Sequence, residues 1–157
     1  MTKAFYPGSF DPFHNGHLEI IKSASKIFES VVIGVGTNPE KTDYFLDQSE
    51  RFLLVKSCLD DLNNVEVVEF QGLAAYVASK IDANCILKGV RSSTDLDDEM
   101  LQSRINSSTG DSIQTVFLPG ISEFGLVSSR YIRQVSILGG DLSKLVPLHV
   151  AQHLAKR

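Results

Sequence analysis

The chain has 157 residues, of which 43% are hydrophobic and 22% are charged, with a formal net charge of -4. These values are typical of a soluble globular protein, and the length suits a single domain over residues 1–157. An acidic chain has no general attraction for nucleic acid or anionic membranes, so we expect neither as a partner. No apolar run approaches the roughly 20 residues that cross a bilayer, and the N-terminus lacks the apolar core of a signal peptide. We therefore expect a cytoplasmic protein.

Short β-branched runs alternate with segments of helical periodicity. Strands are expected at residues 3–6, 31–35, 65–68, 85–87 and 115–118. Helices are expected at residues 16–28, 48–62, 73–81, 95–105 and 128–138, followed by short helices that begin at Asp141 and Pro147. Strands that alternate with crossover helices form parallel sheets. The sequence therefore predicts an α/β fold: a Rossmann-like, doubly wound parallel sheet of five strands with helices on both faces.

Ligands of such sheets bind at the carboxyl ends of the strands, and unusual residues follow the first strand. Ser9 places a hydroxyl beyond the strand end, and His14 and His17 lie three residues apart where a helix begins. The positive end of that helix favours an anion, and Gly16 leaves room for a nucleotide against the backbone. A zinc site would need further ligands, and the remaining histidines, His149 and His153, lie near the C-terminus, so we expect no protein-held metal.

Charged or hydroxyl side chains follow three more strands. Lys41 lies in the loop after the second strand, and Lys88 and Arg91 come at the end of the fourth. The acidic residues from position 95 to 99 allow a simpler interpretation, in which they only pair with these cations. After the fifth strand, Ser128 and its neighbours stand at a helix N-terminus, where they are either ordinary caps or part of a polyphosphate site.

These motifs together resemble a known family. The run Tyr-Pro-Gly-Ser-Phe-Asp-Pro, with Gly16-His17 closing a His-x-Gly-His motif, resembles the opening signature of the phosphopantetheine adenylyltransferases, in the nucleotidyltransferase superfamily. Lys-Gly-Val-Arg at 88–91, with acids downstream, is similar to the family's Arg-Gly-Leu-Arg run. The resemblance implies transfer of the adenylyl group of ATP to 4'-phosphopantetheine, giving dephospho-coenzyme A and pyrophosphate. It also implies Mg²⁺ as cofactor and a homohexamer.

The resemblance implies a role for each matching residue. His17 would stabilise the transition state, and Lys41 and Lys88 would hold the acceptor phosphate. ATP would contact Ser9, Phe10, His17, Gly89, Val90, Arg91, Glu99, Phe124, Gly125, Leu126, Val127, Ser128, Ser129 and Arg130. The acceptor would contact Ser9, Lys41, Ala74 and Lys88.

Three other classes of protein fit parts of the sequence. His14 makes the motif similar to that of nicotinate-nucleotide adenylyltransferases, although those usually open with Gly-Gly and lack the Lys-Gly-Val-Arg run; cytidylyltransferases fit less well. A non-catalytic nucleotide-binding module on the same fold would predict loss of His17 or of the cations, and both are present. Besides His14, four positions depart from the family pattern: Ser9 for Thr, Lys88 for Arg, Asp98 for an aromatic and Arg130 for Ser.

Overall fold

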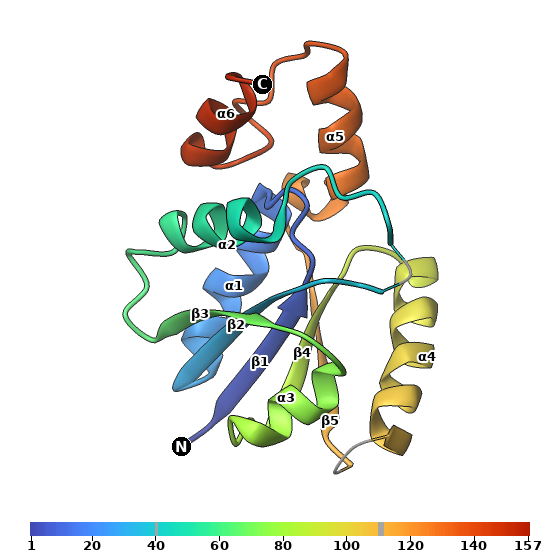
Figure 1. Ribbon diagram of the computed structural model, residues 1–157. Coiled ribbons are helices and arrows are strands. Elements are labelled where there is room, and N and C mark those ends of the chain that lie inside the picture. The colour runs from blue at the N-terminus through green and yellow to red at the C-terminus, as the bar shows by residue number, and fades with distance from the viewer. Residues whose placement is uncertain (40, 110–111) are drawn as a thin grey trace.

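The structure, a computed structural model, describes residues 1–39, 41–109 and 112–157. In these residues one parallel sheet has the strand order β3-β2-β1-β4-β5 (Figure 1). Its strands are β1 (Lys3–Gly8), β2 (Ser30–Gly36), β3 (Val65–Phe70), β4 (Cys85–Val90) and β5 (Gln114–Pro119). The helices are α1 (Asn15–Ile27), α2 (Gln48–Ser57), α3 (Ala74–Lys80), α4 (Ser93–Thr109), η1 (Glu123–Leu126, a 3-10 helix), α5 (Ser129–Ile137) and α6 (Leu148–Leu154). The predicted α/β fold is confirmed.

Helices cover both faces of the sheet because successive strand residues point to opposite sides. Ala4 and Tyr6 belong to the larger buried cluster, together with residues of α1, α2, α5 and α6. Phe5, between them in sequence, belongs to a second cluster with Ala75 and Ala78 of α3. The two clusters bury both faces of the central strand β1. The residues that follow its C-terminal end are therefore attached to a well-packed core.

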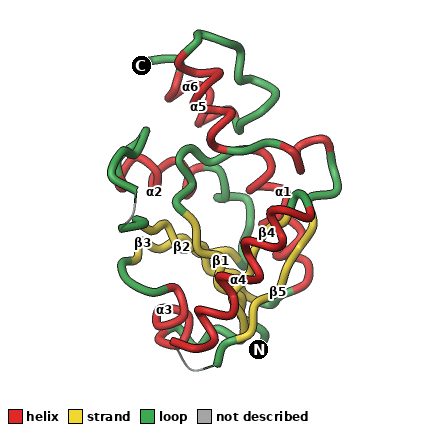
Figure 2. The backbone as a smooth tube through the Cα atoms, turned by 90° about the vertical axis from the view of Figure 1, so that its right-hand side faces the viewer, coloured by secondary structure: helices red, strands yellow, loops and turns green. Residues whose placement is uncertain are grey.

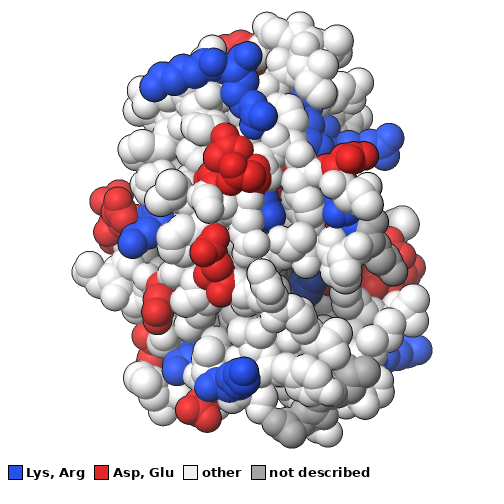
Figure 3. Space-filling view, viewed as in Figure 1, with Lys and Arg blue, Asp and Glu red and all other residues white. Residues whose placement is uncertain are grey.

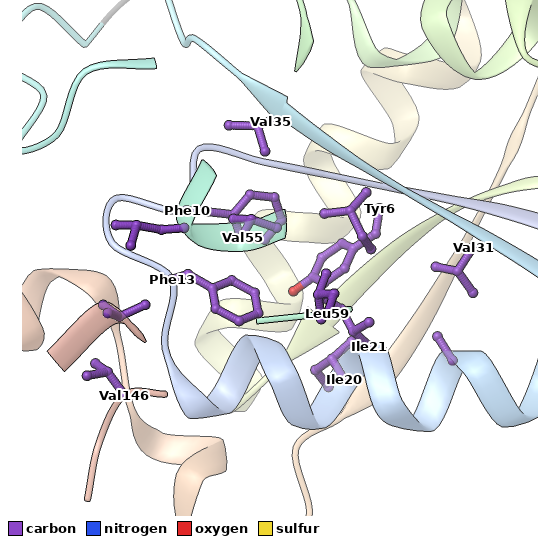
Figure 4. Packing of buried hydrophobic residues seen from close by; sticks show 14 of the residues in the cluster. Tyr6, Phe10, Phe13, Ile20, Ile21, Val31, Val35, Val55, Leu59 and Val146 are labelled. Atoms are coloured by element: carbon purple, nitrogen blue, oxygen red, sulfur yellow. The ribbon is translucent and has the colours of Figure 1, made fainter. Parts of the chain in front are cut away.

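The larger cluster reaches the end of the sheet where the first motif lies. In Figure 4, Ile20 and Ile21 of α1 pack beside Tyr6, and Phe10 and Phe13 extend the cluster beyond the tip of β1. All five side chains are at most 6% exposed. The loop that follows β1 is therefore anchored by buried aromatic rings.

The C-terminal helices stand beyond the carboxyl end of β1 (Figures 1 and 2). Two hydrogen bonds tie their connection to the start of α1: the Asn15 N–H donates to the Leu145 carbonyl at 3.0 Å and its side-chain amide to the Lys144 carbonyl at 3.1 Å. His153 of α6 lies 3.0 Å from Glu50 of α2. In the described parts of the chain, no helix combines the length and apolarity of a membrane span.

Two predicted helices differ from the structure. The helix expected at 48–62 ends at Ser57, because Cys58 caps it and Asp and Asn residues at 60, 61, 63 and 64 favour turns. The helix expected to begin at Asp141 is wrong. The Asp141 carboxylate instead accepts bonds from the N–H and hydroxyl of Ser143, which holds a turn, while α6 does follow Pro147.

Candidate active site

A cavity of about 480 Å³ opens at the carboxyl ends of β1 and β4, where the sequence places its motifs. Most of the predicted site residues line it: Ser9, Phe10, His17, Lys41, Lys88, Gly89, Val90, Arg91, Glu99, Gly125, Val127, Ser128, Ser129 and Arg130. Ala74, Phe124 and Leu126 are not among the lining residues. Segments more than 100 residues apart in sequence thus meet around one space.

His17 and His14 form a reciprocal cap at the start of α1. The His17 N–H donates to Nδ1 of His14, and the His14 N–H donates to Nδ1 of His17, each at 3.3 Å. Their rings stack with centroids 3.7 Å apart. Because Nδ1 of His17 accepts a hydrogen bond, the proton of the neutral ring lies on Nε2. His14, which suggested a different acceptor in the sequence, therefore has a structural role as the N-cap.

The aromatic surroundings of His17 keep its ring uncharged. The ring of Phe13 stacks on it at 5.5 Å, and Phe10 meets it edge-on at 4.9 Å. Burial, with further contributions from His14 and Arg91, holds the pKa of His17 well below its usual value. Burial also lowers the pKa of His14 to about 3. At neutral pH His17 thus offers the cavity a neutral N–H donor.

The turn between β1 and α1 has an unusual backbone at Phe10, whose φ is 49°. This left-handed conformation is uncommon for a residue with a side chain, and such residues are held in place by their surroundings. Here the Phe10 ring packs edge-on against Tyr6 at 5.6 Å and is 2% exposed. The buried ring fixes the turn that presents Ser9 to the cavity.

The cations of β4 have carboxylate partners. Lys88 Nζ lies 3.1 Å from Glu99 Oε2, and Arg91 Nη2 lies 2.9 Å from Asp95 Oδ1. Asp95 and Glu99 therefore do pair with these cations, as the simpler interpretation of the acidic residues expected. This pairing does not remove the cations from the site, because all four residues line the cavity. β4 also extends to Val90, so Lys88 lies within the strand and Arg91 just after it.

Lys41 is held at the cavity by Asp11. Its ammonium lies 2.7 Å from Asp11 Oδ2, and the same carboxylate accepts the N–H groups of Phe45 and Leu46. Burial alone would raise the pKa of Asp11, but these hydrogen bonds and the charge of Lys41 bring that pKa below its usual value. Arg133 donates to the Asp11 carbonyl at 2.6 Å and also lines the cavity.

The serines at the start of α5 are already engaged in local hydrogen bonds. Ser128 caps the helix by accepting the Tyr131 N–H, and the Ser129 hydroxyl donates to the Pro12 carbonyl at 3.0 Å. Both residues nonetheless line the cavity. They fix the N-terminus of α5 beside the His14–His17 turn, so the helix presents its positive end there.

Gly16 has a packing role that differs from the one expected. A Cβ at this position would lie 2.8 Å from the Phe124 carbonyl oxygen and 3.0 Å from the ring of His14. The glycine thus lets η1 approach α1 closely, besides lining the cavity itself. The close contact aligns the two polypeptide segments that bound the cavity on this side.

Sequence reasoning missed several residues of the site. Asp11 and Arg133 were not proposed, although Arg133 lies four residues after Ser129 and therefore on the same side of α5. Tyr6 of β1 also lines the cavity, and burial raises the pKa of its hydroxyl. Among the described residues, no group of three or more His, Cys, Asp or Glu is placed to hold a metal ion.

Comparison with known proteins agrees with this geometry. The model of the cytidylyltransferase-like family matches residues 5–135. A solved structure from Vibrio parahaemolyticus, assigned to the nicotinate-nucleotide adenylyltransferases, superposes with a TM-score of 0.71 over 99% of both chains. Its sequence is only 19% identical, so it supports the fold alone. Fold and site together define a nucleotidyltransferase domain.

Curated relatives specify the family further. A phosphopantetheine adenylyltransferase of a Nocardioides species is 42% identical, covering the whole chain and 98% of the relative. Those of Clostridium beijerinckii and Finegoldia magna are 38% and 35% identical, covering 100% and 99% of the chain and 98% and 96% of the relatives. The chain belongs to the phosphopantetheine adenylyltransferase family.

Proposed function

We propose that the cavity binds ATP and 4'-phosphopantetheine together, with the Nε2–H of His17 directed at the α-phosphate. The reaction of the family is adenylyl transfer from ATP to 4'-phosphopantetheine, which gives dephospho-coenzyme A and pyrophosphate. The observation that carries the proposed geometry is the half-buried His17, whose pKa is lowered, in a cavity that is also lined by Lys41, Lys88 and Arg91.

The reaction needs no general base. A phosphate monoester has its second pKa near 6, so the acceptor is already an ionised nucleophile at neutral pH. Its oxygen attacks the α-phosphorus, a new P–O bond forms, and the bond to the β-phosphate oxygen breaks as pyrophosphate leaves with the electron pair. Catalysis then depends on bringing two polyanions together and on stabilising charge at the α-phosphate, which a fixed N–H donor in a dry site does well.

The ion pairs of the cavity hold the cations ready for phosphates. In our proposal the acceptor phosphate replaces Asp11 at Lys41 and Glu99 at Lys88 as the nearest anion. The two lysine side chains are 29% and 17% exposed, so an anion in the cavity can reach them without unfolding the site. The carboxylates balance the charge of the lysines before phosphates bind, because several unpaired buried charges would be destabilising.

The departing pyrophosphate is assigned to the part of the cavity around the N-terminus of α5. Arg91, Arg130 and Arg133 line the cavity near the N-terminus of α5, to which Ser128 and Ser129 belong as cap and first residue. Arginine binds phosphate oxygens in a bidentate way, and a helix N-terminus adds N–H donors. Arg130, a departure from the family pattern, would add a cation to this part of the cavity.

Magnesium fits this cavity as a companion of ATP. Mg²⁺ usually keeps several waters and binds substrate phosphates with one or two carboxylates. Asp95 and Glu99 line the cavity, and either could contribute such a carboxylate. The described residues contain no group of three or more His, Cys, Asp or Glu that would hold a metal ion without substrate. When bound, Mg²⁺ would neutralise charge on the phosphates that Arg91 and the α5 N-terminus hold.

Contacts outside the cavity lining stay predictions. Ala74 begins α3, and Phe124 and Leu126 belong to η1. Leu126 is 78% exposed at the surface next to the cavity-lining Val127. We propose that these residues meet the pantetheine arm and the adenosine when both substrates are bound.

We further propose a homohexamer in the cytoplasm. Support for self-association comes from α4, on which Met100, Leu101 and Ile105 are 40%, 61% and 51% exposed. Large apolar side chains grouped on one helix often mark a protein interface. On the face seen in Figure 3, by contrast, acidic and basic side chains are interspersed, which does not favour a nucleic-acid partner.

Pyrophosphate release tests the proposed acceptor. ATP is supplied with either 4'-phosphopantetheine or nicotinate mononucleotide, and pyrophosphate is measured in parallel. We expect release only with 4'-phosphopantetheine. Release only with nicotinate mononucleotide would contradict the assigned acceptor. No release with either acceptor would contradict the proposal that this chain catalyses adenylyl transfer.

A further inference from the structure

Among the described lysines and arginines, Arg51 of α2 is the most deeply buried, with 1% of its surface exposed. It does not line the cavity, and none of the sequence motifs includes it. Within the described chain no carboxylate lies within ion-pair distance of its guanidinium. A buried cation is expensive to keep, so its contacts need a reason.

The guanidinium binds main-chain oxygens from two strand ends. Nη1 donates to the carbonyl of Ser9, after β1, and to the carbonyl of Gly36, at the end of β2, each at 2.7 Å. Nε donates to the Leu46 carbonyl at 3.3 Å, and Nη2 lies 3.4 Å from the Thr37 hydroxyl. One side chain thus joins the tips of two adjacent strands and the residue that precedes the N-cap of α2.

The same guanidinium also supports the residues around Lys41. It stacks on the ring of Tyr44 with its central carbon 4.3 Å from the ring centroid, while Lys41 Nζ lies 4.4 Å from the same centroid. Arg51 therefore contacts Ser9 directly and Lys41 through one aromatic ring. Both of these residues line the cavity.

We propose that Arg51 is a positioning residue for adenylyl transfer, which fixes Ser9 and the Lys41 loop relative to each other from behind the cavity. This proposal rests on the proposed function of the site. The planar fork of arginine suits it because several donors leave one rigid group in fixed directions, whereas a lysine offers a single flexible ammonium. Its charge adds a positive potential behind Ser9 that does not depend on any contact with substrate.

The test compares Arg51→Lys and Arg51→Gln with the parent chain, using kcat and KM with ATP and 4'-phosphopantetheine. Since a misplacement of about 1 Å in a site can cost about 100-fold in rate, we expect kcat to fall by about that factor in both folded variants, with smaller changes in KM. Asp47→Ala is the matched control: it removes the N-cap of the same helix, which lies outside the cavity lining, and should leave kcat near the parent value.

A double-mutant cycle separates positioning from stability. Ser9→Ala is introduced into the parent chain and into Arg51→Lys. If Arg51 acts by placing Ser9, the loss of kcat caused by Ser9→Ala is smaller in the Arg51→Lys background. Equal losses in both backgrounds, kcat within about threefold of the parent in both folded Arg51 variants, or failure of both to fold would each overturn the proposal. An inactive parent chain would instead contradict the proposed function.

Discussion

His17 keeps a neutral imidazole near several cations, and the rings of Phe10, Phe13 and His14 around it favour the neutral form. Its Nδ1 is occupied by the His14 N–H, and its faces lie against His14 and Phe13. Burial disfavours the protonated ring, and the charge of Arg91 acts in the same direction. The tautomer and the charge state needed for donation to a phosphate are therefore set by the fold of the turn and need no substrate.

The two histidines predict a loss of stability in mild acid. An unfolded chain protonates them near pH 6.5, whereas the native pKa of His14 is about 3 and that of His17 is also lowered. Their contribution to stability is therefore complete above pH 6.5 and is lost as the pH falls toward the native values. We expect the free energy of unfolding, measured in urea, to drop by up to about 1.4 kcal/mol per pH unit for each histidine below pH 6.

A non-titrating cap provides the control for this pH dependence. His14→Asn keeps a side chain that caps helices well but removes one buried histidine. Its free energy of unfolding should depend less steeply on pH between 6.5 and 4.5. Parallel curves for the parent and the variant would show that His14 does not cause the acid sensitivity.

At the level of secondary-structure elements, the contact between η1 and α1 predicts an effect opposite to helix propensity. Alanine favours helices over glycine by about 1 kcal/mol. In Gly16→Ala, however, the new methyl group would meet the Phe124 carbonyl at 2.8 Å, and such crowding typically costs about 1–3 kcal/mol. We expect net destabilisation in thermal unfolding and a clear loss of turnover, because η1 would move away from α1.

Lys22→Ala serves as the comparison for Gly16→Ala, since Lys22 is exposed on the same helix. That substitution should leave both stability and turnover close to the parent values. If Gly16→Ala left stability and turnover unchanged, as expected for Lys22→Ala, the close approach of η1 to α1 would matter for neither.

The sequence predicted the strands and the positions of the motifs, because both depend on local patterns. Short apolar or β-branched runs marked all five strands, and the motifs from Ser9 to His17 and from Lys88 to Arg91 stood at or after the carboxyl ends of two of them. The partners of these residues were not predictable in this way. Arg51 reaches Ser9 across 42 positions and Arg133 reaches Asp11 across 122, and nothing in the local sequence of either arginine specifies such contacts.

For the whole molecule, the predicted assembly concerns the apolar surface of α4. If the chain forms a homohexamer, its mass by light scattering will be six times the 17.3 kDa of one chain. Replacing the exposed Leu101 by Glu should lower that mass, because a charge would be buried in the interface. A parent chain that scatters as a monomer would contradict the assembly, and an unchanged hexamer in Leu101→Glu would exclude α4 from the interface.

The most direct measurement of the central claim is the formation of dephospho-coenzyme A by the parent chain and by His17→Ala. The account predicts one product molecule for each pyrophosphate released by the parent. It also predicts a loss of kcat of about 100-fold or more in the variant, as for removal of a donor to transition-state charge. Circular dichroism should show that the variant remains folded. Near-parental turnover in a folded His17→Ala chain would contradict the assignment of His17 and the mechanism built on it.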